Sequence, residues 1–294
     1  MTVNRSSLST QVASPSEVSM LIQWTAGEGW NPGIDDSALF YATDRSGFFI
    51  TYLDDCPVAG ISLVKHSAEQ SFLGLYLCLP EFRDQGIGLA TWNHALASVS
   101  GHCVGLDGVV EQQDNYRQSG FSYHFGNMRY SGPLMPSLIA ALAVTSSQST
   151  VKIRPATPND CDSIVEYDAI IGGFKRHSFI DAWLTPCDTR QTCLALADDA
   201  VVGMVGIRKC IEGFKVGPLL ANSFAIALSL IYSAAEIANG ENIMLDVPEK
   251  NLAAIELAKS LNLQPIFETA RMYRGPAPVI DLGRLFGAAT LELG

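Results

Sequence analysis

The chain has 294 residues, of which 48% are hydrophobic and 17% charged, enough for one large or two ordinary domains with a sizeable core. Its 30 acidic and 19 basic residues give a formal net charge of −11, which argues against nucleic acid as a main partner and mildly favours a cationic substrate. No apolar run reaches the roughly 18 residues of a membrane span, and the first residues lack the hydrophobic region of a signal peptide. The seven scattered cysteines contain no Cys-x-x-Cys pair. We therefore expect a cytoplasmic protein without a membrane span, a disulfide or a metal site.

The first half of the chain predicts alternating helices and strands. Ser14 and Glu17 have the spacing of a capping box, so a helix begins there. Apolar runs bounded by turn residues predict the other elements: strands at 47–53, 58–64 and 72–80, a helix at 89–96, a strand at 104–110, a helical piece at 112–119 and two last strands ending near 130.

The second half repeats this order after a polar stretch at 145–150. Thr157 and Asp160 form a second capping box behind a first strand. The predicted elements are a strand at 151–156, helices to about 170 and at 177–184, strands at 192–197, 201–207 and 214–220, a helix at 223–238, a strand at 243–247, a helix at 251–261 and a strand at 266–273. This repetition predicts two domains, 1–135 and 151–294, joined by a linker at 136–150.

Residues 83–88 have the pattern Arg-x-x-Gly-x-Gly between a predicted strand and a predicted helix. Two glycines let the backbone curl so that consecutive N–H groups point into one concavity, and the positive end of the helix faces the same place. Such a turn binds a pyrophosphate. Thr91 replaces the third glycine of the dinucleotide fingerprint, and no Gly-Lys-Ser/Thr follows as in a P-loop.

The pattern resembles the acetyl-CoA loop of the GNAT acyltransferase superfamily, Arg/Gln-x-x-Gly-x-Gly/Ala. Residues 116–121 resemble a second motif of that superfamily, Tyr-x-x-x-Gly-Phe on the helix after the fifth strand. Segments 28–33, 111–116 and 267–273 are similar to a two-domain bacterial subfamily with an ordinary N-terminal and a divergent C-terminal domain. The resemblance covers nearly the whole chain. It implies an α/β (α+β) fold of tandem GNAT domains, each with a mixed, mainly antiparallel central sheet flanked by helices.

The resemblance also implies an acetyl-CoA-dependent N-acetyltransferase that acts on the amine of a small molecule by direct attack. Backbone N–H groups of a bulged fourth strand, at about 76–79, would bind the thioester carbonyl oxygen. Tyr116 would act as general acid toward the CoA thiolate, and its alternative role is to pack against Phe121. The residues implied to contact acetyl-CoA are Leu75, Tyr76, Leu77, Arg83, Asp84, Gln85, Gly86, Ile87, Gly88 and Asn115.

The general base is left open by the sequence. Many GNAT enzymes carry a Glu on the fourth strand, and residues 73–77 contain no carboxylate. Glu28, Asp107 and Glu111 are the base candidates, together with Glu81. Asp107 lies in an otherwise apolar strand, where its alternative role is to satisfy backbone groups.

The second half departs from the family pattern. Its equivalent of the glycine loop, 219–225, has no glycine, and Ala258 and Asn262 stand where the tyrosine and glycine of the second motif would fall. We therefore expect this half not to bind acetyl-CoA in the usual way and to form one wall of the acceptor pocket, with contributors drawn from Lys215, Glu268 and Tyr273.

Several properties stay open at this point. The missing strand carboxylate motivates a different class of function, an acyl-CoA-binding sensor or regulatory protein without turnover. A monomer and a homodimer are both compatible with the sequence.

Overall fold

The computed structural model describes residues 7–99, 101–139 and 151–294. Residues 1–6, on which the signal-peptide prediction partly rests, and 140–150, most of the predicted linker, lie outside the described residues. The division of the chain at that linker therefore stays a prediction. Among the described residues, no helix is long and apolar enough to cross a membrane.

The capping boxes and apolar runs form helices and strands in both halves of the chain. The first half contains β1 (Leu8–Val12), α1 (Pro15–Gly27), α2 (Asp36–Thr43), β2 (Phe48–Leu53), β3 (Cys56–Lys65), β4 (Gln70–Cys78), η1 (Pro80–Phe82), α3 (Ile87–Ala97), β5 (Cys103–Val109), η2 (Val110–Gln112), α4 (Gln113–Gln118) and β6 (Ser122–Pro133). The second half contains β7 (Lys152–Pro155), η3 (Pro158–Asp160), α6 (Cys161–Gly172), α7 (His177–Leu184), β8 (Arg190–Ala197), β9 (Ala200–Lys209), β10 (Phe214–Ala221), α8 (Phe224–Ala238), β11 (Asn242–Pro248), α9 (Leu252–Ser260), β12 (Gln264–Arg274) and β13 (Leu285–Gly287).

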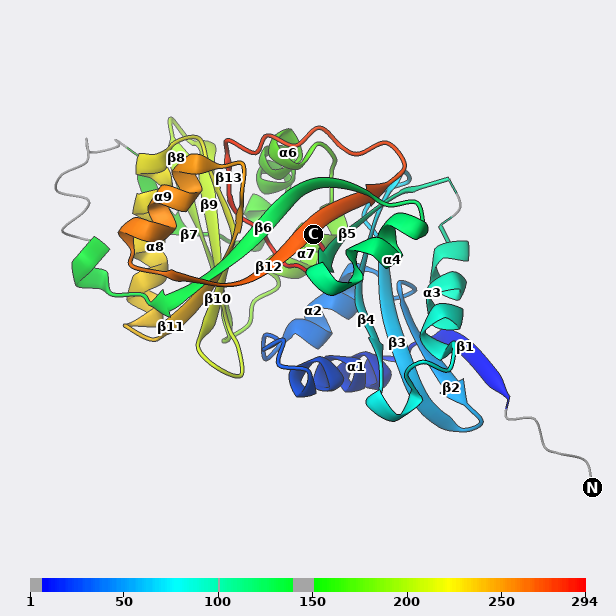
Figure 1. Cartoon of the computed structure of the whole chain (residues 1–294). Helices are drawn as coiled ribbons and strands as arrows, with labels where there is room; N and C mark the ends of the chain where they lie inside the picture. Colours follow the sequence, from blue (N-terminus) through cyan, green and yellow to red (C-terminus); the bar gives the residue numbers. More distant parts are fainter. Residues whose placement is uncertain (1–6, 100, 140–150) are drawn as a thin grey trace, which may run out of the picture.

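The two halves share one 13-stranded sheet because they exchange their long strands. Its order is β1-β2-β3-β4-β5-β12-β6-β11-β10-β9-β8-β7, with β13 pairing to β10. Strand β12 of the second half lies against β5 of the first, and β6 of the first lies against β11 of the second. The two exchanged strands run side by side, antiparallel, at the middle of the molecule (Figure 1). Among the strand pairs of the described residues, only β4–β5 and β10–β11 are parallel. The predicted fold class is confirmed, but the exchange joins what the sequence predicted as two sheets.

The end of the first half differs from the prediction of two short strands ending near 130. Residues 122–133 form the single strand β6. Gly126 and Gly132 lie inside this strand at its pairing with β12 and β11, close to side chains of the second half. Glycine in a strand interior often marks a close approach of a neighbour and so mimics a turn signal in the sequence.

Three large apolar clusters hold these layers together, and a fourth, small one joins Val58 and Ala59 to Ile87. One lies between α8, α9 and the second-half strands, and another lies between α3 and the first-half strands. The cluster between them belongs to both halves: Leu21 and Phe40 from α1 and α2 pack with Phe179 and Trp183 from α7. Since all four side chains are buried, the space between the halves is a continuous core that holds the surrounding loops in place.

Candidate active site

A bulge in β4 opens the sheet beside the glycine loop. Gly60 of β3 pairs with Leu77 and Ser62 pairs with Gly74, so Leu75 and Tyr76 together face one residue of β3. Leu75 takes φ +45°, the left-handed region. The parallel pairing of β4 with β5 ends at Leu73, and the two strands then diverge. A bulge that ends pairing leaves backbone groups without a cross-strand partner, as carbonyl binding requires.

The predicted strand is β4, and the predicted glycine turn and helix follow it. Asp84 and Gly86 take φ values of +61° and +79°, and Gly86 is the N-cap of α3. A Cβ built on Gly86 meets no atom within 4 Å, so the concave side of the turn is open. The amides of Asp84, Gln85 and Gly86 donate to no acceptor among the described residues. These features fit the diphosphate of coenzyme A, which accepts hydrogen bonds from such amides at a helix N-terminus.

Arg83 connects this loop to the end of α1. Its Nε donates to the carbonyl of Cys78 at 2.9 Å, and its terminal nitrogen lies 2.5 Å from a carboxylate oxygen of Glu28. The two side chains are 44% and 33% exposed, so the pair borders solvent. The structure thus brings the base candidate Glu28 beside the predicted phosphate loop, where it is ion-paired.

Tyr116 lies in an aromatic cluster on the α3 side of the sheet. Its ring stacks on Trp92 with centroids 5.5 Å apart and planes 17° apart, and Tyr76 meets the same Trp92 edge-on at 5.2 Å. Gly108 of β5 makes room for the ring, because a Cβ there would be 2.6 Å from a Tyr116 ring carbon. Burial and the neighbouring Tyr76 raise the pKa of Tyr116 to about 12, so its hydroxyl keeps its proton at neutral pH.

Tyr76 also reaches the first turn of α3. A Cβ on Gly88 would lie 2.7 Å from the Tyr76 hydroxyl oxygen, so a larger residue at this position would displace the Tyr76 side chain. Burial raises the pKa of Tyr76 as well. Two protonated phenols therefore belong to one aromatic cluster between the bulge, the loop helix and α4.

The other predicted site residues lie apart from this cluster. Asp107 points to the opposite face of β5 from Gly108, since strand side chains alternate. Its carboxylate accepts two hydrogen bonds from Arg271 of β12, at 2.9 and 2.7 Å, and one from Asn127 at 2.9 Å. Glu111 is exposed, and Asn115 is exposed with its amide bonded to Gln112. The Leu75 and Leu77 side chains pack into the core beside α1.

The corresponding opening in the second half is filled by the chain itself. Strands β10 and β11 pair only over residues 214–216 and 243–245 before they diverge. β13 then occupies the gap, pairing Leu219 with Gly287 and Leu220 with Leu285. Gly217 shows how close this segment lies, because a Cβ there would be 2.0 Å from the Ala288 carbonyl oxygen. Helix α8 begins at the side-chain cap of Ser223, without a left-handed glycine.

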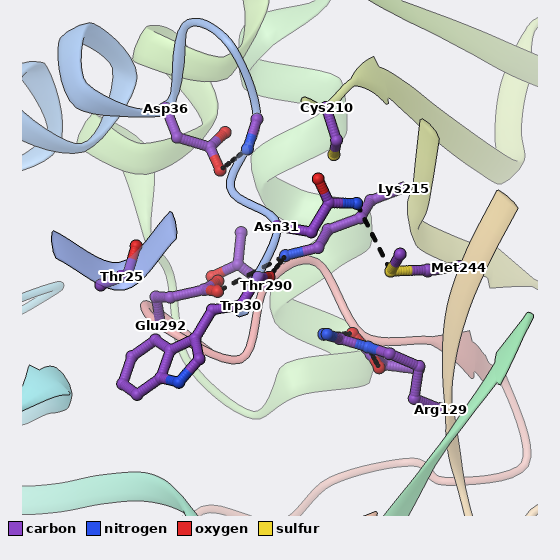
Figure 2. A network of polar contacts seen from close by, with 12 residues as sticks. Thr25, Trp30, Asn31, Asp36, Arg129, Cys210, Lys215, Met244, Thr290 and Glu292 are labelled. Carbon is purple, nitrogen blue, oxygen red and sulfur yellow. Dashed lines mark hydrogen bonds and ion pairs between the residues drawn. The ribbon is translucent and has the colours of Figure 1, made fainter. Parts of the chain in front are cut away.

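A network of buried charges joins the two halves (Figure 2). Lys215 of β10 is 3% exposed; its Nζ donates to the Trp30 carbonyl at 3.3 Å and lies 3.7 Å from Glu292. Around this pair, Arg129 binds Asp246 at 2.7 and 2.8 Å, and Arg208 lies 3.2 Å from Asp36. The sequence offered one signal for this network, namely single charges such as Lys215 inside apolar strands. Glu292 carried no such signal.

Comparison with known proteins identifies the family. Residues 17–121 match the "Acetyltransferase (GNAT) family" and residues 164–287 match an "Acetyltransferase (GNAT) domain". The chain is 31% identical over 283 residues to a holothin acyltransferase of Pseudoalteromonas sp. (strain SANK 73390), covering 96% of this chain and 93% of the relative. The chain belongs to the GNAT acyltransferase family, with two GNAT domains.

Solved structures show the same fold at low identity. A putative acetyltransferase from Pyrococcus horikoshii superposes with a TM-score of 0.79 at 17% identity, covering 98% of this chain and 96% of the other. A tandem GNAT protein from the clavulanic acid biosynthesis pathway superposes with a TM-score of 0.62 at 13% identity, covering 92% and 100%. Among the described residues, no group of three His, Cys, Asp or Glu side chains could hold a metal ion.

Proposed function

We propose that this protein is an acetyl-CoA-dependent N-acyltransferase that acylates the amine of a small molecule, with its catalytic site in the first half. The observation that carries the proposal is the open left-handed turn at Gly86 beside the bulged β4. Acetyl-CoA would supply the activated acyl thioester. The acidic chain and a relative named for holothin acylation support a small amine as acceptor.

We assign each residue of the site a role from its position. The amides of 84–88 and the N-terminus of α3 hold the diphosphate, with Arg83 beside them. Backbone N–H groups at the β4 bulge hold the carbonyl oxygen as negative charge develops on it. Tyr116 donates its proton to the departing sulfur, which its raised pKa permits because the phenol stays neutral at physiological pH.

The general base is proposed from the positions of the candidate carboxylates. Among Glu28, Asp107 and Glu111, Glu28 lies nearest the loop, through its ion pair with Arg83. Glu81, the fourth candidate, is exposed in η1 directly before the loop. Glu111 lies at the surface near α4, and Asp107 is bonded to Arg271 on both oxygens. We further propose a cytoplasmic protein that works as a monomer or homodimer.

A thiol-release assay with acetyl-CoA tests the proposal. The panel contains holothin, ethanolamine, benzylamine, tryptamine and spermidine. We expect release with at least one amine, and Tyr116→Phe is expected to lower kcat about 100-fold or more while acetyl-CoA binds within about twofold of the unchanged protein. Calorimetric binding of acetyl-CoA without turnover across the panel would instead support the sensor, which the carboxylate-free β4 favours.

A further inference from the structure

In the part of the chain that the structure describes, almost all buried carboxylates have partners on both oxygens. Asp107, Asp168 and Asp246 each accept from an arginine on both oxygens. Asp36 accepts from the Gly33 amide at 2.7 Å on one oxygen, and Arg208 lies 3.2 Å from the other. This is the expected arrangement, because a buried charge without partners is costly.

Glu292 breaks this rule. Its side chain is 11% exposed, and its Oε1 lies 3.7 Å from Lys215 Nζ, beyond hydrogen-bonding distance. Its Oε2 is buried and has no hydrogen-bond partner among the described residues. Burial alone would raise the pKa of Glu292, but Lys215, Arg208 and Arg129 outweigh that effect and lower it. Glu292 is therefore a buried, ionised carboxylate whose Oε2 has no hydrogen-bond partner among the described residues and whose Oε1 has only the 3.7 Å ion pair with Lys215.

The C-terminal segment places Glu292 against β4, the strand that carries no carboxylate. The Glu292 backbone lies against Gly74 of β4, because a Cβ on Gly74 would be 2.1 Å from the Glu292 carbonyl oxygen. Gly74 immediately precedes the bulge at Leu75. Figure 2 shows the Glu292 side chain between the end of α1, the Trp30 loop and Lys215. The carboxylate thus lies on the α1 side of β4, opposite the face that carries Tyr116 and the α3 helix.

We propose that Glu292 binds the acceptor: its Oε2 accepts a hydrogen bond from the acceptor's N–H and holds the nitrogen toward the β4 bulge. This inference rests on the proposed acyltransferase function. Lys215 acts as a positioning residue, since its amine is bonded to the Trp30 carbonyl and holds Glu292 beside the α1–α2 loop. Because Oε2 is buried, the acceptor reaches it only when a neighbouring side chain moves aside. Trp30 lies beside Glu292 in Figure 2.

Glu292→Gln tests the proposal, since it keeps the shape and removes the charge. The substrate is the panel amine that the unchanged protein converts fastest. We expect the KM for that amine to rise about 10- to 100-fold, as when a hydrogen bond to a charged group is lost, while the Kd for acetyl-CoA stays within about twofold. Glu241→Gln is the matched control, because Glu241 also pairs with a lysine, Lys209 at 2.6 Å, but is 51% exposed. It should leave KM unchanged.

A double variant separates acceptor binding from a purely structural role. Glu292→Gln leaves Lys215 unpaired and can lower stability, whereas Lys215→Met with Glu292→Gln removes both buried charges and should restore the melting temperature. If the restored protein still has the raised KM, the proposal holds. A KM that returns to normal, or one that never changed in Glu292→Gln, overturns it. An unchanged protein that transfers no acyl group to any amine overturns the proposed function, and this inference with it.

Discussion

The bidentate pair between Asp107 and Arg271 allows a quantitative test of how the two halves are joined. Asp107 lies on β5 and Arg271 on the exchanged strand β12, with side chains 0% and 8% exposed. Asp107→Asn keeps the volume but removes the charge and turns an amide N–H toward the guanidinium. Breaking one member of a buried ion pair costs about 3–5 kcal/mol, because the other charge stays buried without compensation. At this chain length each kcal/mol lowers the melting temperature by roughly 2 °C, so we expect a fall of about 6–10 °C.

Thermal unfolding followed by circular dichroism measures this fall, and two further variants define its cause. Asp107→Asn with Arg271→Met removes both charges and should recover most of the loss. Asp114→Asn breaks the exposed pair with Arg117, whose side chains are 86% and 50% exposed, and should change stability by less than about 1 kcal/mol.

The same variants decide between the two roles of Asp107. If the residue is structural, acyl transfer by Asp107→Asn, measured well below its melting temperature, stays within a few fold of the unchanged protein. A loss of turnover above 100-fold with an unchanged melting temperature would refute this reasoning and make Asp107 the base.

Three further predictions concern the loop, the acid and the C-terminal segment. Gly86→Val should weaken acetyl-CoA binding more than tenfold in calorimetry. It should also cost about 1–2 kcal/mol of stability, because φ +79° disfavours a β-branched residue. Gly27→Ala is the control, because a Cβ at Gly27 meets no atom within 4 Å. Since the pKa of Tyr116 is about 12, turnover should not fall through loss of its proton between pH 8 and 10, and a decline with a midpoint near 10 that Tyr116→Phe lacks would contradict the assignment. His66, whose Nε2 contacts the Leu293 carbonyl at 2.7 Å, has its pKa lowered from 6.5 to about 4 by burial and by Arg176, so the folded state favours the neutral ring. Its contribution, roughly 3 kcal/mol, is present above pH 6.5 and is lost as the pH falls toward 4; denaturant titrations of His66→Gln should show a flatter pH dependence in that window.

Local patterns were enough to predict the glycine turn and the helix that follows it. Gly86, Gly88 and Tyr116 occupy positions defined by neighbours a few residues away, so their spacing predicts the turn, the helix start and the aromatic position. The physical reasons are local too: Gly86 needs the left-handed region and Gly88 needs room for Tyr76.

The exchange of β6 and β12 could not be predicted in this way. Both strands pair antiparallel with their neighbours, so the direction of pairing does not decide which half either strand completes. What distinguishes them is long-range: Asp107 of β5 meets Arg271 of β12, 164 residues away, and Arg129 of β6 meets Asp246 of β11, 117 residues away. Each charge looks like an isolated anomaly in its own strand until the partner strand is known.

The divergence of the second half and the proposed acceptor site have one structural origin. A half that binds coenzyme A must leave the gap between its parallel strands open, and β4 and β5 diverge in that way. In the second half β13 fills the gap between β10 and β11, so that half has lost the cleft. The same segment continues beyond β13 to Glu292 and lies against Gly74 of β4. The segment that closes the second cleft therefore also carries the chain to the first one and places Glu292, the proposed acceptor-binding residue, against β4.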